Sequence, residues 1–290
     1  VRLISRILTI SMVAIAQLYS ATAYAEQIKQ HCFDSVGCWS FVRFGKYIDV
    51  FFTADSTCPV SSGVVVSLAG EDHRFRIVSN EPGEHHAGQF PFPTQSVVTW
   101  KFMLFAGTNE AEHDDTVVYE LPFDAGTASR VTQAYDGPTT HQGEHHYAID
   151  FSMSTGTPVH VARAGEVALI VDAPCDDPAG TGCRNVRVDI RHPDGTYATY
   201  QHLKPDSIAV AVLEQVEAGQ LLARSGNSGK SAGPHLHFQV YAPTPRGKQI
   251  VDSVATMFST GDGETTLKSS STYSRPVNSA TSDVASGLQR

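Results

Sequence analysis

The chain has 290 residues, 41% of them hydrophobic, and its 21 Lys and Arg against 30 Asp and Glu give a formal net charge of −9. This apolar content argues against a wholly disordered chain. It is enough for two ordinary domains, because one hydrophobic core rarely grows past about 250–300 residues. The acidic balance argues against general binding of nucleic acid, whose phosphates would be repelled by such a surface.

Residues 1–25 have the pattern of a secretory signal peptide. Arg2 and Arg6 precede the apolar run 7–16, and small residues follow up to an Ala-Tyr-Ala site that ends at Ala25. The apolar run is shorter than the ~20 residues that a membrane span needs, so we expect cleavage after Ala25 and no permanent membrane anchor. The mature protein is then exported, to the periplasm or out of the cell, and loss of the two arginines takes its net charge from −9 to −11.

Export would allow disulfide bonds among the five cysteines. Cys175 and Cys183 bracket the Pro/Gly loop CDDPAGTGC. We expect a bridge between them, which would stabilise the fold by roughly 2–3 kcal/mol through loop entropy. Among Cys32, Cys38 and Cys58 at most one pair can form, and the sequence leaves open which cysteine remains.

Residues 26–125 are expected to form a β-rich N-terminal domain. Short runs rich in β-branched and aromatic residues are separated by clusters of Gly, Pro, Asn and Asp, as is typical of strands and turns. The runs are KYIDVFFTAD (46–55), GVVVSLAG (63–70), HRFRIVS (73–79), SVVTWKFMLFAG (96–107) and DTVVYELPF (115–123). This spacing predicts a small β-sandwich. The sequence indicates no catalytic constellation in it and leaves its role open.

Residues 126–258 continue the β pattern, so the expected fold class is all-β. A Pro-Asp-Gly turn that ends at Gly195 predicts a hairpin over 185–202. Further expected strands are TPVHVAR (157–163), EVALIVDA (166–173) and HLHFQVYA (235–242). Residues 259–290 are rich in Ser and Thr and poor in large apolar groups, and we expect them to form a disordered tail.

The tetrapeptide Gly-Glu-His-His occurs twice, at 83–86 and at 143–146. The first copy runs into the Gly/Pro-rich segment HAGQFPFP, with no acidic residue four positions after either histidine, and is expected to be a solvated loop. In the second copy His146 stands four residues before Asp150. That spacing alone is weak evidence for a metal site, because the segment HLKPD at 202–206 has it too.

The segment HLHF at 235–238 adds a stronger signal. Side chains two apart on a strand point to the same face, so His235 and His237 can share one site. Together with His146 and Asp150 they make a zinc set, because zinc binds His nitrogen and Asp oxygen and a catalytic site keeps one position for water. His202, on the outgoing arm of the predicted hairpin, adds a histidine for proton transfer near neutral pH.

Three segments, HYAIDFSMSTGTPVHVARAGEV, YATYQHL and SGNSGKSAGPHLHFQV, stand in an order and spacing that resembles the lysostaphin-type (LytM-like) zinc metallopeptidases. These enzymes cleave peptide bonds in bacterial cell-wall peptidoglycan. The resemblance covers about residues 125–245. It implies an antiparallel β-sheet peptidase domain with an open groove lined by loops. Gly226, Gly229 and Gly233 would either shape a loop beside that groove or form a plain flexible turn.

The same resemblance implies the roles of the site residues. One Zn²⁺ per chain would be held by His146, Asp150 and His237. His235 would act as general base on the zinc water, and His202 would orient or stabilise the tetrahedral intermediate. His145 makes a shift of one residue conceivable, although only His146 stands four residues before Asp150.

We therefore expect an exported zinc metalloendopeptidase that acts on peptidoglycan cross-links or stem peptides. Two alternatives stay open. One is a catalytically silent LytM-like regulator of other cell-wall hydrolases, and the other is a secreted zinc protease that acts on proteins. Peptidoglycan peptides are the expected partners, and the sequence leaves protein partners and the bond that is cleaved unknown.

Overall fold

The computed structural model describes residues 26–33, 36–54, 60–68, 71–79, 81–91, 98–107, 111–172, 184–243 and 251–277. The predicted signal peptide, Cys58 and the predicted Cys175–Cys183 bridge lie outside the described residues. Within those ranges no helix is long and apolar enough to cross a membrane. The chain divides into two compact units. The first takes in Val1–Thr57, Gly63–Ile77 and Glu81–Met103, and the second takes in Cys58–Ser62, Val78–Asn80 and Leu104–Arg290.

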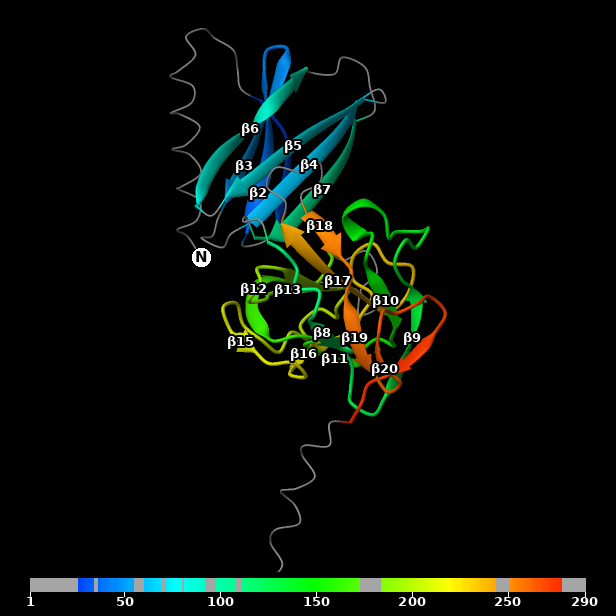
Figure 1. The fold of residues 1–290 in the computed structure, drawn as a ribbon. Helices are drawn as coiled ribbons and strands as arrows, with labels where there is room; N and C mark the ends of the chain where they lie inside the picture. The colour runs from blue at the N-terminus through cyan, green and yellow to red at the C-terminus, as the bar shows by residue number, and fades with distance from the viewer. Residues whose placement is uncertain are drawn as a thin grey trace, which may run out of the picture. The chain divides into compact units, whose positions relative to one another are not determined.

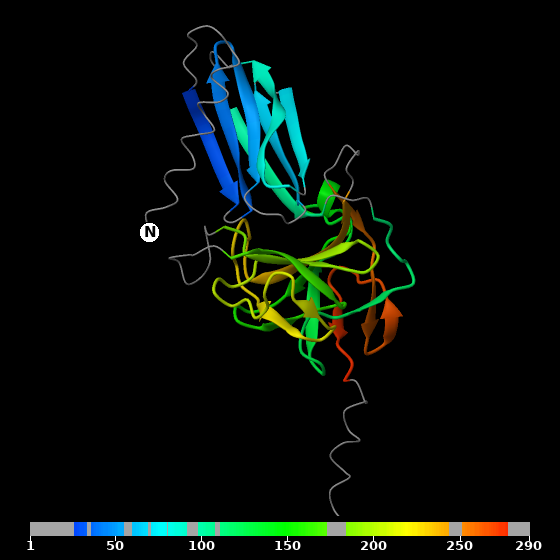
Figure 2. The same ribbon diagram turned by 90° about the vertical axis from the view of Figure 1, so that its left-hand side faces the viewer.

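Two antiparallel layers build the first unit, whose strands are blue to cyan in Figures 1 and 2. One sheet has the order β1-β2-β3-β6 and the other the order β5-β4-β7. Their bounds are β1 Glu26–Phe33, β2 Gly37–Phe44, β3 Tyr47–Ala54, β4 Val60–Leu68, β5 Glu71–Ser79, β6 Gly83–Pro91 and β7 Val98–Ala106. Aromatic rings join the layers, with Trp100 of β7 lying 4.4 Å from Phe41 and 6.4 Å from Phe90 between centroids. The predicted small β-sandwich is confirmed.

Two local features of this unit go beyond the prediction or correct it. Cys32 and Cys38 face each other across β1 and β2 and form a disulfide, which settles the pairing that the sequence left open. The first Gly-Glu-His-His lies in β6 and not in a solvated loop. The apolar contact of Phe90 and the pairing of β6 with β3 hold this Gly-rich segment extended.

The second unit centres on a nine-stranded sheet with the order β15-β12-β13-β14-β17-β10-β9-β21, in which β18 also pairs with β17 (Figure 1). Its first elements are β8 Val118–Glu120, β9 Ala128–Gln133, the 3-10 turn η2 Gly143–His145, β10 Ile149–Ser152, β11 Pro158–His160, β12 Gly165–Val171, β13 Arg187–Arg191 and β14 Tyr197–Gln201. The remaining strands are β15 Gln215–Val216, β16 Leu221–Arg224, β17 His235–Pro243, β18 Val251–Val254, β19 Met257–Thr260, β20 Gly263–Thr265 and β21 Thr272–Ser274. The described residues contain no α-helix, and the all-β prediction is confirmed.

The predicted hairpin is also confirmed. β13 and β14 pair antiparallel from Val188↔Tyr200 to Arg191↔Tyr197, and the Pro-Asp-Gly turn connects them. Asp194 fixes the turn, because its carboxylate accepts hydrogen bonds from the backbone N–H and the hydroxyl of Thr196.

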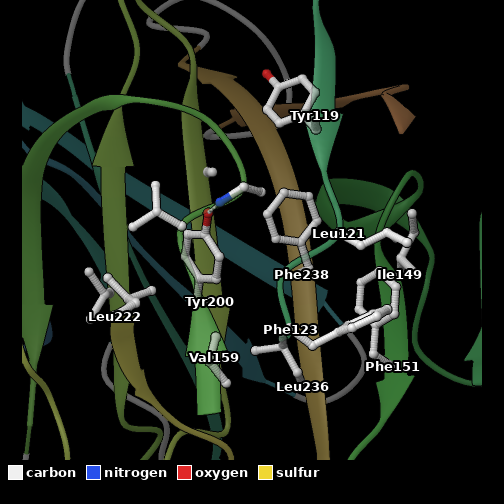
Figure 3. Close-up of a cluster of buried hydrophobic side chains, with 14 of the residues drawn as sticks. Tyr119, Leu121, Phe123, Ile149, Phe151, Val159, Tyr200, Leu222, Leu236 and Phe238 are labelled. Atoms are coloured by element: carbon white, nitrogen blue, oxygen red, sulfur yellow. Dashed lines mark hydrogen bonds between the residues drawn. The ribbon is translucent and has the colours of Figure 1, made fainter. Parts of the chain in front are cut away.

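The core of the second unit lies on one face of the sheet. Alternate residues of the central strands point into it, among them Phe151 of β10, Tyr200 of β14 and Leu236 and Phe238 of β17 (Figure 3). All four are fully buried or nearly so. Since side chains alternate along a strand, the residues between them leave the sheet on its other face.

The unit boundary and the C-terminal tail differ from the prediction. Residues 104–125 belong to the second unit and not to an N-terminal domain that ends at 125, because β8 pairs in parallel with β19. Residues 259–277 are ordered, with β21 paired to β9. Phe258 and Leu267 are buried and anchor this segment, and Ser and Thr residues lie in its extended stretches. Residues 278–290 lie outside the described chain.

His192 makes the stability of the second unit depend on pH. Burial lowers its pKa to about 4, although its Nδ1–H donates to the Ala164 carbonyl. The folded state therefore keeps His192 neutral, whereas the unfolded chain takes up a proton below about pH 6.5. The stability that depends on a neutral His192 is complete above about pH 6.5 and is lost as the pH falls toward 4.

We expect the free energy of unfolding to fall by up to about 3 kcal/mol over this pH range. His192→Asn keeps a donor but cannot titrate. Urea unfolding between pH 4.5 and 8 should show a smaller fall in unfolding free energy for the variant than for the wild type. Equal falls in the two proteins would contradict the assignment.

Candidate metal centre

The sheet register places Asp150 of β10 directly opposite His237 of β17. β14 lies along the other edge of β17, where Gln201 pairs with His237, so His202 follows at the end of β14 beside the same position. His235 lies two residues before His237, on the same face. Asp150, His235 and His237 leave the sheet on the face opposite Leu236 and Phe238, and the register brings these three together. His202 lies past the end of β14 with φ +60°, and its ring centroid is 4.7 Å from that of His235.

His141 is the third member of the cluster around Asp150 and His237. Its Nε2 lies 3.2 Å from Asp150 Oδ1, and His237 Nδ1 lies 2.9 Å from the same oxygen. One ligand atom from each of the three residues falls within 4.8 Å of the others, and this is the one such group among the described residues. The exposed fractions are 0% for His141, 8% for Asp150 and 7% for His237.

The tautomer of His141 fits a cation at this point. Its Nδ1 lies 2.8 Å from the Ala134 carbonyl oxygen, which can only accept, so Nδ1 carries the proton. Nε2 then presents a lone pair to a carboxylate oxygen and is buried without a hydrogen bond. Two acceptors that face each other are repulsive unless a positive charge lies between them. Two imidazoles and a carboxylate are also the ligands that zinc takes.

His146, the expected ligand, lies outside this cluster, which contains His141 instead. His146 Nδ1 pairs with Asp136 at 3.1 Å, and its side chain is 38% exposed. The physical reason is local: residues 143–145 form the 3-10 turn η2 rather than the start of a strand, and His146 caps that turn in a helical conformation. The ring centroid of His145 lies 5.5 Å from that of His237, and the Nδ1–H of His145 donates to Gln239.

His202 and His235, which the sequence predicts to be the catalytic pair, lie together beside the cluster. Their ring centroids are 4.7 Å apart, and His235 Nε2 is 3.7 Å from Asp150 Oδ1. His202 donates from Nδ1 to the Ser228 carbonyl, and His235 donates from Nδ1 to the Gly233 carbonyl. Each ring therefore offers Nε2 as its proton acceptor.

The charges of the site are set by burial and by neighbouring groups. Burial raises the pKa of Asp150, but when no cation lies between them, protons on the facing nitrogens of His141 and His237 outweigh it and hold that pKa far below its usual value. Burial also lowers the pKa of His202 to about 3, with His237 and His235 reinforcing the shift. At neutral pH the site thus offers a carboxylate ligand and a neutral His202.

Close packing requires glycine at two of the three positions of the loop 225–234 that the sequence singled out. A Cβ at Gly226 would lie 2.6 Å from the Lys204 nitrogen, and one at Gly229 would lie 2.7 Å from Asn185 Cβ. Gly229 also has φ +75°. Asn185 in turn accepts the backbone N–H of His202, so this close approach supports a catalytic candidate. Around Gly233 there is open space, and that glycine is not required by packing.

Residues 144–253 match Peptidase family M23. The matched segment includes Asp150, His202, His235 and His237 and begins after His141. Glycyl-glycine endopeptidase ALE-1 of Staphylococcus capitis is 31% identical over 134 residues, which are 46% of this chain and 34% of that protein.

Peptidoglycan DD-endopeptidase ShyA of Vibrio cholerae is 34% identical over 113 residues, which are 39% of this chain and 23% of that protein. The chain thus matches about a third or less of the length of these curated relatives. Among solved structures, a mutant catalytic domain of the M23 protein EnpA from Enterococcus faecalis has 28% identity and a TM-score of 0.33. That match covers 46% of this chain and 92% of the EnpA chain.

Proposed function

Because residues 144–253 match Peptidase family M23, we propose that this chain is a zinc metalloendopeptidase that hydrolyses peptide bonds of peptidoglycan. The observation that carries the proposal is the convergence of His141, Asp150 and His237 next to two further histidines whose Nε2 atoms are left to act on a substrate. A regulator that had lost its chemistry would have no reason to keep this arrangement.

In this proposal His141 Nε2, Asp150 Oδ1 and His237 Nδ1 would hold the zinc ion. When bound, the ion would act as a Lewis acid and lower the pKa of a water molecule. His235 accepts a proton at Nε2 from the attacking water and later gives it to the leaving amine. His202 is neutral at pH 7, and its Nδ1–H donates to the Ser228 carbonyl. Its Nε2 can therefore accept a hydrogen bond from a reacting group and orient that group.

The choice of substrate follows the relatives. ALE-1 is named a glycyl-glycine endopeptidase and ShyA a peptidoglycan DD-endopeptidase. The name of ShyA points to peptidoglycan and the two names point to different bonds, so we propose peptidoglycan peptides as substrate without naming the bond. Such a substrate lies outside the cytoplasmic membrane, which agrees with the export predicted from residues 1–25.

Metal analysis of the purified protein followed by digestion of sacculi tests the proposal. We expect close to one zinc per chain, release of peptides from sacculi, and loss of that release after chelation with recovery on adding zinc. Mass spectrometry of the products would name the bond. Protein without bound zinc would favour the regulator alternative, and cleavage of denatured proteins but not of sacculi would favour the secreted protease.

A further inference from the structure

Gln133, the last residue of β9, contacts both parts of the proposed metal site that come from outside β17. It pairs with Asp150 in the sheet register, and its Nε2 lies 3.1 Å from Asp150 Oδ2. The same Nε2 lies 2.7 Å from Thr140 Oγ1, next to His141. Its Oε1 accepts the backbone N–H of Thr139 at 3.2 Å. One side chain therefore joins the carboxylate to the loop that carries His141.

The orientation of this amide is fixed by its partners. The Asp150 carboxylate can only accept, and the Thr139 N–H can only donate. The amide nitrogen must therefore face Asp150 and the amide oxygen must face Thr139. A side chain of different polarity or length could not satisfy both ends.

The loop is built around this side chain. A Cβ at Gly137 would lie 2.2 Å from Gln133 Cγ and 2.7 Å from Gln133 Oε1, so any other residue there would displace the Gln133 side chain from this position. Gly137 also accepts the backbone N–H of His141 at 3.2 Å. The chain thus passes from Gln133 through Gly137 to His141 by direct contacts.

From these contacts we propose that Gln133 is a positioning residue of the metal site. By binding Oδ2 it turns Oδ1 of Asp150 toward the two imidazoles, and by holding Thr139 and Thr140 it sets the height of His141 above the sheet. Groups that orient metal ligands in this way typically change metal affinity 10–100-fold when they are removed. This inference rests on the zinc site of the proposed function.

The test compares Gln133→Met with Gln215→Met. Both changes remove an amide that donates to a carboxylate, and the donor at Gln215 binds Glu166 at the exposed edge of the sheet. Gln133→Asn is a milder variant, which keeps the amide but is too short to span Asp150 and Thr140. Zinc affinity is measured by competition with a chromophoric chelator, and the visible spectrum of the cobalt-substituted protein reports the ligand geometry.

We expect 10–100-fold weaker zinc binding and an altered cobalt spectrum for Gln133→Met, with a smaller loss for Gln133→Asn. Gln215→Met should match the wild type, and the melting temperatures of the metal-free proteins should stay close together. Wild-type affinity and spectrum in both Gln133 variants would overturn this inference while leaving the proposed function intact. Failure of the wild type to bind zinc would instead overturn the proposed function, and this inference with it.

Discussion

Replacing His141 by alanine is expected to abolish zinc binding and sacculus hydrolysis together, whereas His146→Ala should leave both within about twofold of the wild type. Loss of a group that merely orients a ligand costs 10–100-fold in metal affinity, so loss of a ligand should cost more than about a hundredfold. His141 meets Asp150 at 3.2 Å inside the protein, and His146 instead pairs with Asp136 at the surface.

Stability should not obscure this comparison. The His146 and Asp136 side chains are 38% and 71% exposed. An ion pair of this kind is worth about 0–1 kcal/mol, so His146→Ala should fold normally. In His141→Ala the hydrogen bond to the Ala134 carbonyl is lost, and His141→Gln serves as a second variant that fills the same space with a weak zinc ligand.

Three measurements on the wild type and the three variants decide the assignment: zinc content, zinc affinity and peptide release. Circular dichroism of the metal-free proteins checks that they are folded. Zinc retained by His141→Ala but lost by His146→Ala would contradict the structure. That result would instead support the spacing of four residues before Asp150 on which the sequence prediction rested.

The members of the site that come from strands were predictable from sequence. A strand alternates its faces, so the pattern His-x-His fixes the relation of His235 to His237 without knowledge of the fold. Asp150 lies on a short apolar run that reads as a strand, and His202 follows a predicted hairpin arm. For Asp150, His235 and His237 the local strand pattern agrees with the positions that the structure gives them, whereas His202 lies past the end of its strand.

His141 could not be found by the same reasoning, because it lies in a loop. Between it and Asp150 the chain makes a 3-10 turn, so no regular period relates the two residues. His146 stands four residues before Asp150, the spacing that the family resemblance implies, and was therefore predicted to be the ligand. A usable signal was nonetheless present: three histidines stand between 141 and 146, and Gly137 and Gly143 mark turns around them. Such a cluster should be treated as several candidates until geometry selects one.

The tail was mispredicted for a different reason. Composition argues that a segment poor in large apolar residues cannot form a core of its own. Residues 259–277 do not need one, because they complete a core that the rest of the unit supplies. A few residues suffice for that, and composition averaged over the segment does not reveal them.

Ending the chain after Phe258, the predicted end of the peptidase domain, is therefore expected to destabilise the second unit severely. The deletion removes β21, which pairs with β9, the neighbour of the strand that carries Asp150. It also removes buried Leu267, worth about 1.5–3 kcal/mol. Arg275 is lost as well, which donates to the Phe123 carbonyl at 2.6 Å and pairs with Glu120.

Together these losses reach at least about 5 kcal/mol, which is comparable to the whole stability of many domains. We expect the truncated protein to be insoluble or to melt more than about 10 °C below the full chain. A chain that ends after Val277 keeps every contact named here and should melt like the full chain. Equal melting temperatures for the chain ending after Phe258 and the full chain would contradict the structural role of this segment.

Arg275→Ala separates one contact from the deletion as a whole. Arg275 is buried. Its removal leaves the Phe123 carbonyl without a hydrogen-bond donor and Glu120 without its cation, and we expect the free energy of unfolding to fall by about 3 kcal/mol. Arg191→Ala is the matched control, because Arg191 pairs with Glu166 at 3.3 Å in the same unit but is 51% exposed, and should cost less than about 1 kcal/mol. Thermal melts of the two variants should differ in this order. Since β21 supports β9 and β9 carries Gln133, the zinc affinity of Arg275→Ala should fall together with its stability.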